Sequence, residues 1–373
     1  MHVILIGGGI MGLLSAYELV NAGCKVSLFD KSQAGTEASW AGGGIVSPLY
    51  PWRYDAPITA LASWGQGYYP QLSEHLKQAT GIDPQFNPCG LLMLDAEDEA
   101  LAVRWARQHG REMQEVSDTE AKALEPHLQC TVSRGLWMPK VGSVRNPRLL
   151  QSLMAALQNH SGFSLSINEP VTTLVSENGR AKGVTTAKGR YNADAVVVSA
   201  GAWSAGLLQS LGISLPVKPV RGQMVAIQAP IDWLQHIVLK NGTYIVPRKD
   251  GLVLAGSTLE FVGFDKSTTP SAKSFLLERA YQMMPSLAQF PVVAQWAGLR
   301  PGSPDGVPFI GELEQLPGVY LNVGHYRNGL VLAPAACRLL ADLLLQREPI
   351  VDPQLYRPDV RLRAQPIANP EWR

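Results

Sequence analysis

The stretch Val3-Ile-Leu-Ile-Gly-Gly-Gly-Ile-Met-Gly12 decides the fold of this chain. Its apolar start predicts a strand, and the residues after it predict an apolar helix and a second strand, Val26-Ser-Leu-Phe-Asp30. In such a βαβ unit Gly7 permits the tight turn, Gly9 lets the backbone approach a pyrophosphate, and Gly12 lets the helix pack closely on the sheet. The helix N-terminus offers N–H groups to the phosphates. The stretch therefore predicts a dinucleotide-binding turn.

Asp30 ends the second predicted strand, where a carboxylate can accept hydrogen bonds from ribose hydroxyls. A carboxylate at this place disfavours a 2′-phosphate, so NADP is the least expected occupant. A glycine-rich turn with a purely structural role is the alternative. The strand before the turn, the helix after it and the acid on the next strand together favour a bound dinucleotide.

Composition limits the class of protein. The chain has 373 residues, of which 46% are apolar and 17% charged, with a net charge of +1. This length predicts two domains, and this composition is typical of a soluble globular protein. Positive charges form no block, so we expect no nucleic-acid partner. No signal peptide and no membrane-spanning run is recognised, and the four dispersed cysteines are expected to be reduced, so we expect a cytoplasmic protein. Histidines and cysteines show no metal-ligand spacing, so no metal site is expected.

The order of the predicted elements indicates an α/β fold with two interleaved parts. Strands at 3–6, 26–30, 194–200 and 319–323 and helices from 58, 147 and 329 are typical of a Rossmann-like domain. Between them, hairpin signals at Asn178-Gly179 and Asn241-Gly242 and strands near 225, 252 and 293 predict antiparallel sheet. We expect a cofactor-binding domain built from residues 1–84, 141–215 and 296–373, and an α+β substrate domain with an antiparallel sheet built from residues 85–140 and 216–295.

Further glycine-rich segments indicate which dinucleotide binds. A nicotinamide cofactor usually needs only the first turn, whereas this chain has small residues at 38–45, a strand-to-glycine turn at Gly201, and a turn at 324–329 before an apolar helix. Small residues let a planar ring approach the backbone, and a helix N-terminus stabilises the negative charge of a reduced flavin. FAD therefore fits the pattern better than NAD.

Four motifs resemble those of one flavoprotein family. They are Ile6-Gly-Gly-Gly-Ile-Met-Gly12, Ala38-Ser-Trp-Ala-Gly-Gly-Gly-Ile45, Gly298-Leu-Arg-Pro-Gly-Ser-Pro-Asp-Gly306 with Pro308-Phe-Ile-Gly311, and Gly324-His-Tyr-Arg-Asn-Gly-Leu330. In order, and over essentially the whole chain, they are similar to the D-amino-acid oxidase family, most of all to its glycine-oxidising branch in thiamine biosynthesis. The resemblance implies non-covalent FAD, since no cysteine lies between Cys130 and Cys337.

Three side chains are candidates for substrate binding. Arg300 ends an apolar strand, and a buried guanidinium needs an anion, either a substrate carboxylate or a structural partner such as Asp305. Tyr244 either adds a hydrogen bond to the same carboxylate or is an ordinary strand aromatic. Arg327 matches the family position that faces substrate and flavin, although a surface arginine is the alternative. Leu259 and Ile45 match pocket-wall positions, and a core role suits both equally well.

The resemblance assigns a larger set of residues to the flavin. Some lie at the pyrophosphate and ribose, others near the adenine and the isoalloxazine, and the two glycine turns are included from the pattern itself. The complete set is Gly7, Gly9, Ile10, Met11, Gly12, Asp30, Lys31, Ala38, Ser39, Gly43, Gly44, Ile45, Val171, Gly201, His325, Tyr326, Arg327, Asn328, Gly329, Leu330 and Val331.

The resemblance also implies the reaction. With the carboxylate of glycine, sarcosine or a D-amino acid fixed, the Cα–H passes as hydride to the flavin without a side-chain base, and molecular oxygen is reduced to hydrogen peroxide. The products are a 2-oxo acid and ammonia or an amine, and family likeness suggests a homotetramer. The first alternative is a D-amino-acid dehydrogenase that uses a quinone-type acceptor. A flavin domain of a tRNA-modifying protein and an electron carrier are the others.

The segment Trp52-Arg53-Tyr54 departs from the family pattern by its aromatic character. It either lines the pocket entrance and alters which amines enter, or forms a surface loop packed by Trp52. The sequence leaves both interpretations open.

Overall fold

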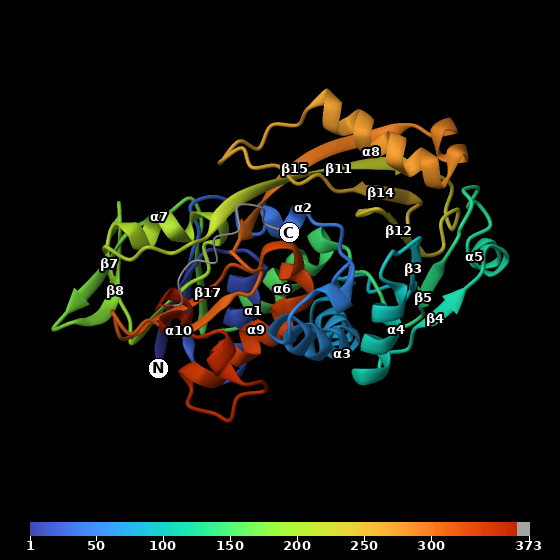
Figure 1. The fold of residues 1–373 in the computed structure, drawn as a ribbon. Coiled ribbons are helices and arrows are strands. Elements are labelled where there is room, and N and C mark those ends of the chain that lie inside the picture. Colours follow the sequence, from blue (N-terminus) through green and yellow to red (C-terminus); the bar gives the residue numbers. More distant parts are fainter. Residues whose placement is uncertain (364–373) are drawn as a thin grey trace.

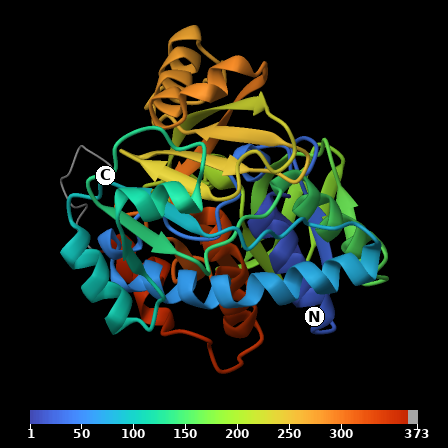
Figure 2. The same ribbon diagram turned by 90° about the vertical axis from the view of Figure 1, so that its right-hand side faces the viewer.

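The computed structural model describes residues 1–363, and two large β-sheets with packed helices form its core (Figure 1). Within these residues one sheet has six strands, the other has eight, and a three-stranded sheet packs against the first. Figure 2 shows α8 (Pro270–Met283, orange) at one end of the molecule, against the eight-stranded sheet, and α3 (Ala56–Thr80, blue) across the opposite half. Residues 364–373 of the predicted segment 296–373 lie outside the described residues.

The six-stranded sheet is parallel except at one edge. Its order is β16 (Phe309–Glu312), β17 (Val319–Val323), β10 (Ala195–Val198), β1 (His2–Ile6), β2 (Lys25–Phe29) and β6 (Phe163–Ser166), and only β16 pairs antiparallel. Along β1, Val3 and Leu5 pack on one face of the sheet, while Ile4 and Ile6 pack on the other. Burial of both faces explains the unbroken apolar sequence of the central strands. The α/β class predicted from the sequence is confirmed.

Helices cover one face of this sheet. They are α1 (Ile10–Asn21), α3, α6 (Asn146–Gln158) and α9 (Gly329–Leu344). Pro334 lies inside α9 and has no N–H to donate to the carbonyl of Leu330. The Tyr69 hydroxyl of α3 donates to that carbonyl instead, at 2.6 Å. The proline is therefore compatible with the helix because a neighbouring helix satisfies the freed acceptor.

The other face packs against the small sheet and α7 (Ser204–Gln209). The small sheet consists of β7 (Val171–Glu177), β8 (Arg180–Thr186) and β9 (Gly189–Asn192), and its first turn holds the predicted Asn178-Gly179 pair. Leu174, Ala181 and Val184 bury their side chains in this layer. The carboxyl ends of β1 and β10 remain uncovered at one edge of the sheet, where ligands bind in folds of this kind.

The eight-stranded sheet has the order β15 (Val292–Gly302), β11 (Lys218–Gln228), β14 (Leu252–Gly256), β13 (Thr243–Pro247), β12 (Ile237–Lys240), β3 (Leu91–Leu94), β5 (Gly135–Met138) and β4 (Gln114–Val116). All its pairs are antiparallel except β3 with β12, whose strands come from distant parts of the chain and need no hairpin. β11 and β15 are its longest strands, and their paired ends extend toward the six-stranded sheet (Figure 1).

Short elements complete the described chain. They are α2 (Ala38–Ala41), α4 (Glu99–Gln108), α5 (Asp118–Leu124), α10 (Pro358–Arg363) and the 3-10 turns at Pro51–Arg53, Gly201–Trp203, Pro285–Gln289, Tyr326–Asn328 and Pro353–Leu355. None of the helices within residues 1–363 has the length and apolar character needed to cross a lipid bilayer.

Candidate active site

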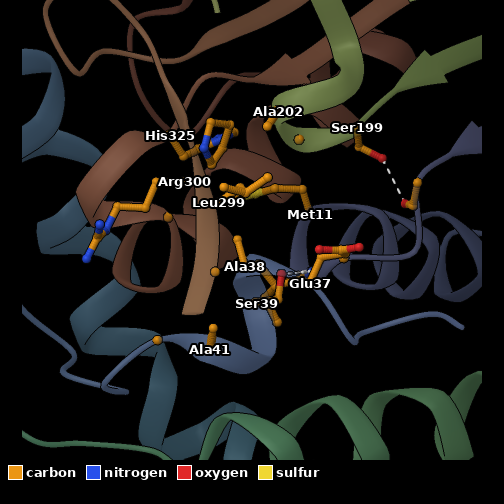
Figure 3. Close-up of a pocket in the computed structure, with 18 of the residues that line it drawn as sticks. Met11, Glu37, Ala38, Ser39, Ala41, Ser199, Ala202, Leu299, Arg300 and His325 are labelled. Carbon is orange, nitrogen blue, oxygen red and sulfur yellow. Dashed lines mark hydrogen bonds between the residues drawn. The ribbon is translucent and has the colours of Figure 1, made fainter. Parts of the chain in front are cut away.

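A cavity of about 570 Å³ lies where the two large sheets meet. The turn after β1, the turn after β10 and the segment around α2 line it from the six-stranded side, and β11, β13 and β15 line it from the other side. Figure 3 shows Met11, Ser39, Leu299, Arg300 and His325 around this space. The cavity therefore brings together the glycine-rich segments and the candidate substrate residues, although they are far apart in the sequence.

The turn after β1 has the close packing that a dinucleotide cradle requires. Gly7 has φ +105°, and a Cβ on Gly12 would lie 1.8 Å from the Gly7 carbonyl oxygen. The Ser199 hydroxyl donates to the carbonyls of Ile6 and Gly7, both at 3.1 Å, and joins this turn to β10. Helix α1 starts here with no side-chain cap from its own N-cap residue. The exposed helix end suits an anionic ligand.

Substitution of Gly12 by alanine is expected to abolish FAD binding. The new Cβ would overlap the Gly7 carbonyl, which is backbone and can move only if α1 separates from the turn. Overpacking of this kind costs about 1–3 kcal/mol of unfolding free energy. Flavin absorbance after purification and thermal unfolding measure the two effects.

The matched control is Gly67→Ala, because Gly67 lies in α3 at a place where an added Cβ would meet no neighbouring element of the described chain within 4 Å. This control should retain the flavin, and its free energy of unfolding should rise by about 0.5–1 kcal/mol. A Gly12→Ala protein with full flavin content and unchanged stability would contradict the prediction.

Asp30 and Lys31 line the cavity beyond this turn. The Asp30 carboxylate accepts backbone N–H bonds from Gly8 at 2.7 Å and from Ser32 at 2.8 Å. The Lys31 ammonium lies 3.3 Å from the ring centroid of Trp203, and burial lowers its pKa. Asp30 thus orders the phosphate turn in addition to the ribose contact that the sequence predicts.

The segment around α2 forms another wall of the cavity. The Ser39 hydroxyl accepts a hydrogen bond from the Ile10 N–H at 2.9 Å, which joins this wall to the phosphate turn. The Asn146 side-chain amide donates to the Ser39 carbonyl at 2.8 Å. A Cβ on Gly43 would lie 2.7 Å from the Tyr244 ring. Neighbouring side chains therefore pack closely against this wall, and its small residues leave the backbone accessible from the cavity.

His325 is a buried polar residue on the cavity wall. Its side chain is 1% exposed, and within residues 1–363 its Nε2 has no hydrogen-bond partner. Burial lowers the pKa of His325 from 6.5 to about 3, so the ring is neutral at physiological pH. A buried, unpartnered nitrogen that lines a cavity is expected to bind a ligand atom. The cradle, the glycine-rich wall and this nitrogen together fit a flavin dinucleotide.

The His325 pKa predicts acid sensitivity of the apoprotein. Because the unfolded chain binds a proton near pH 6.5 that the folded ring takes up only near pH 3, the free energy of unfolding should fall as pH drops through this window. The slope contributed by this ring is at most about 1.4 kcal/mol per pH unit. Denaturant unfolding between pH 7 and pH 4 should therefore show a flatter profile for His325→Gln than for wild type. Equal slopes would contradict the assignment.

Arg300 lies at the end of the cavity where β11, β13 and β15 meet. Its Nη1 donates to the Thr258 carbonyl at 3.1 Å and its Nη2 to the Ser257 hydroxyl at 2.6 Å. No carboxylate of residues 1–363 lies within 4.0 Å of it, and Asp305 pairs instead with Arg361 at 2.7 Å. The structural ion pair with Asp305 is thus excluded. Burial, and then the charge of Arg327, lower the pKa of Arg300.

Tyr244 and Met224 lie beside this guanidinium on the cavity wall. Tyr244 is 7% exposed, and its hydroxyl donates to the Met224 Sδ at 3.4 Å, a weak acceptor. The Arg300 guanidinium lies over Gly222, since a Cβ there would be 2.1 Å from Nη1. Arg327 is exposed and lines the cavity at the turn before α9. In the described part of the chain, this end therefore combines a cationic fork with a phenol and has no carboxylate among its lining residues.

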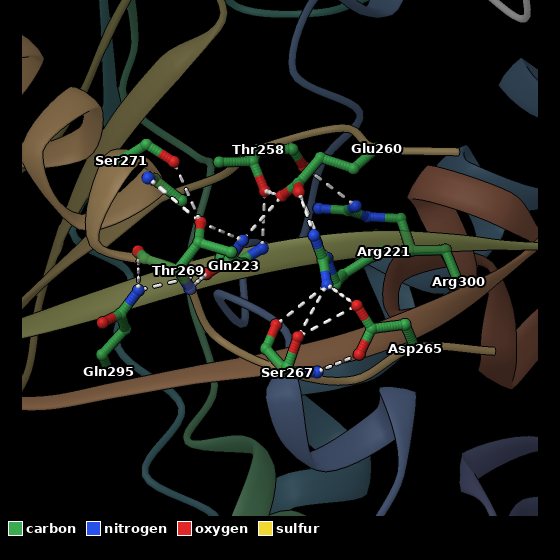
Figure 4. A network of polar contacts seen from close by, with 11 residues as sticks. Arg221, Gln223, Thr258, Glu260, Asp265, Ser267, Thr269, Ser271, Gln295 and Arg300 are labelled. Carbon is green, nitrogen blue, oxygen red and sulfur yellow. Dashed lines mark hydrogen bonds and ion pairs between the residues drawn. The ribbon is translucent and has the colours of Figure 1, made fainter. Parts of the chain in front are cut away.

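A neighbouring network shows how a buried arginine is normally compensated here (Figure 4). Arg221 pairs with Glu260 at 2.5 Å and with Asp265 at 2.5 Å. The Thr258 hydroxyl donates to Glu260 at 2.5 Å and accepts from the Gln223 N–H at 2.8 Å. This network fixes the segment around Thr258, whose carbonyl accepts a hydrogen bond from Arg300. Arg221 therefore forms ion pairs with two carboxylates, whereas the Arg300 guanidinium remains available to bind an anion in the cavity.

The structure places most of the predicted site residues on the cavity wall. Exceptions are Gly12, which packs beneath the turn, Val331, which is 1% exposed in the helical core, and Leu259, which is 37% exposed and outside the lining. Ile45 lines the cavity and also belongs to a hydrophobic cluster. The sequence reasoning missed Asn146, Met224, Gly222 and Ser257, which carry no motif signal because tertiary packing brings them to the site. Gly222 and Met224 lie in β11, Ser257 directly follows β14, and Asn146 begins α6.

The aromatic segment at 52–54 does not line the cavity. Trp52 is 6% exposed and packs in a hydrophobic cluster, and Arg53 forms an ion pair with Asp98 at 2.7 Å. The preceding Leu49 lines the cavity instead, and the Tyr50 hydroxyl accepts the Gly242 N–H at 3.1 Å. The interpretation as a loop packed by Trp52 agrees with this arrangement.

Comparison with known proteins identifies the class. Residues 2–343 match the DAO family of FAD dependent oxidoreductases, and the chain belongs to this family. It is an FAD-dependent enzyme, and the fit of the cavity to FAD agrees with this. None of the described cysteines lines the cavity, in keeping with non-covalent binding.

Particular relatives carry more specific names. The chain is 49% identical to a glycine oxidase of Pseudomonas aeruginosa, over 97% of this chain and 99% of that one. The crystal structure of the glycine oxidase from Geobacillus kaustophilus superimposes with a TM-score of 0.90 at 33% identity, covering 95% of this chain and 97% of that one. The iminodiacetate oxidase of Chelativorans sp. BNC1 gives a TM-score of 0.86 at 28% identity, covering 95% and 98%.

Proposed function

We propose that this protein oxidises glycine and related small amines, with oxygen as electron acceptor and 2-oxo acid, ammonia or amine, and hydrogen peroxide as products. The observation that carries the proposal is the guanidinium of Arg300, which lines the cavity of an FAD enzyme and has no carboxylate partner within residues 1–363. The names of the glycine oxidase relatives, one of them 49% identical, support the choice of substrate.

Each residue at this end of the cavity has a role in the proposal. Arg300 binds the substrate carboxylate through the N–H groups that its bonds to Ser257 and Thr258 leave free. The Tyr244 hydroxyl turns from Met224, a weak acceptor, to the same carboxylate. Arg327 lies on the exposed rim and adds a second positive charge. These contacts would orient the Cα–H of a small amine toward the glycine-rich wall.

Among residues 1–363, no carboxylate lines this end of the cavity to abstract a proton. Within residues 1–363 the cavity's only lining carboxylates are Asp30 and Glu37, which bond to the phosphate turn and to Lys266 respectively. His325 is a poor base because burial lowers its pKa to about 3. FAD, when bound, supplies the hydride acceptor, so the amine needs only to bind in its neutral form. The protein's contribution is positioning and charge.

The test is an assay of the FAD-reconstituted protein in air with glycine, sarcosine, D-alanine, D-proline and iminodiacetate. Glycine plus oxygen and water should give glyoxylate, ammonia and hydrogen peroxide in equal amounts. If an amine bleaches the flavin but little peroxide forms, the proposed electron acceptor would have to be a molecule other than oxygen. Flavin that no amine bleaches under nitrogen would overturn the proposal.

We also propose a homotetramer in the cytoplasm. The resemblance of the full chain to its family supports the assembly, and light scattering of the purified protein tests it. A monomer at micromolar concentration would contradict it.

A further inference from the structure

Arg248 lies at the end of β13, directly behind the loop formed by residues 42–45. Its side chain is 8% exposed, and it does not line the cavity, whereas the loop does. Its Nη2 donates to the Gly43 carbonyl at 2.9 Å and its Nη1 to the Val144 carbonyl at 3.0 Å. One guanidinium therefore bonds the cavity loop and the strand-like segment behind it.

The fork of Arg248 fits a loop that has no room for side chains. A Cβ on Gly44 would lie 2.8 Å from Arg248 Nη2 and 2.1 Å from the Val144 carbonyl, and Gly44 has φ +77°. Tyr244 lies in β13, and Arg248 directly follows the last residue of that strand, Pro247. The Tyr244 ring contacts the loop at Gly43. Tyr244 in β13 and Arg248 just after it therefore both contact the loop at Gly43.

The charge of Arg248 has no acidic counterpart in the described part of the chain. No carboxylate of residues 1–363 lies within 4.0 Å of it, because Asp250 in the same turn pairs with Arg145 at 2.6 Å. Burial lowers the pKa of Arg248 to about 10, so the group stays cationic at neutral pH. An unpaired buried charge is costly, and a negatively charged ligand on the other side of the loop would reduce that cost.

We propose that Arg248 is a positioning residue, which fixes the loop of residues 42–45 for FAD and holds a positive charge behind it that favours the reduced flavin. Reduced flavin carries more negative charge than the oxidised form, so a nearby cation stabilises it selectively. The assignment of this end of the cavity to the flavin ring rests on the proposed function, since Tyr244 and Arg300 mark where substrate meets flavin. The predicted effect of Arg248 on the affinity for FAD does not depend on where the flavin ring lies.

The experiment compares Arg248→Met, Arg248→Lys and the control Arg145→Met. Arg145 is the neighbouring arginine, and its side chain bonds Asp250 and Gln85 but no residue of the cavity loop. For each protein the dissociation constant of FAD is measured by titrating the apoprotein, and the midpoint potential of the bound flavin by equilibration with a reference dye. Thermal unfolding of each apoprotein reports whether the fold is retained.

Arg248→Met should weaken FAD binding by about tenfold or more and make the midpoint potential more negative. Arg248→Lys keeps the charge but loses the fork, so its affinity should fall while its potential stays closer to wild type. Wild-type affinity and potential in Arg248→Met, or equal changes in Arg145→Met, would overturn the proposal. If Arg248→Met does not fold, wild-type FAD affinity in Arg248→Lys overturns it. No amine is added, so a failure to oxidise glycine leaves this test unaffected.

Discussion

Replacement of Arg300 by methionine is expected to lower kcat/KM for glycine by about 30- to 5,000-fold, because truncating one member of a buried charge pair costs about 2–5 kcal/mol and each ~1.4 kcal/mol is tenfold in rate. Methionine keeps the length and much of the apolar stem, so the fold should persist. The loss should appear mainly in KM, since the carboxylate is bound in the ground state as well as in the transition state. Steady-state peroxide formation measures it.

The specificity of this effect is tested with an amine that lacks a carboxylate, such as ethylamine. Wild type should strongly prefer glycine over ethylamine, and Arg300→Met should lose most of that preference. The control is Arg190→Met, because Arg190 is half-exposed on the small sheet and pairs with Glu177. Unchanged KM for glycine in Arg300→Met, with the flavin still bound, would show that the carboxylate binds elsewhere.

The local pattern around residues 3–30 was sufficient to predict the first βαβ unit. The apolar run of β1 reflects burial on both faces, and each glycine of the turn has a separate steric reason, so sequence and geometry are tightly linked. The same holds for the hairpin at Asn241-Gly242, which joins β12 and β13. The short strands β4 and β5 were missed because no tight hairpin joins them to their partners. β16 was missed because it has only four residues, although its partner β17 is the next strand in the sequence.

The site was predictable only where a residue belongs to a motif. Arg300 and Tyr244 were found through the family pattern, and their contact with Gly222 and Met224 depends on the register of β11 with its neighbours. β15 runs from Val292 to Gly302 as one strand of the eight-stranded sheet, across the boundary predicted at residue 296. Strand register of this kind is fixed by tertiary packing, which no local sequence signal reports.

Gly222→Ala is expected to lower kcat/KM for glycine by about 10–100-fold without unfolding the protein, since a displacement of about 1 Å at a catalytic contact can cost 10²-fold. The new Cβ would lie 2.1 Å from Arg300 Nη1 and 2.3 Å from Nη2. These atoms are the far end of a flexible side chain, so the guanidinium rather than the backbone must move. β11 keeps its ladder to β15, because Gly222 pairs with Gly298 through backbone groups.

Gly222→Ala changes the position of the Arg300 guanidinium but keeps its charge, whereas Arg300→Met removes the charge itself. If the site works as proposed, Gly222→Ala retains FAD, retains its melting temperature within a few degrees, and raises KM for glycine while the cation is still present. Gly67→Ala serves again as the matched control, because it adds the same methyl group to α3 in open space. Wild-type KM in Gly222→Ala would mean that Arg300 can bind substrate from a displaced position. The close contact between Gly222 and the Arg300 guanidinium would then have no part in substrate binding.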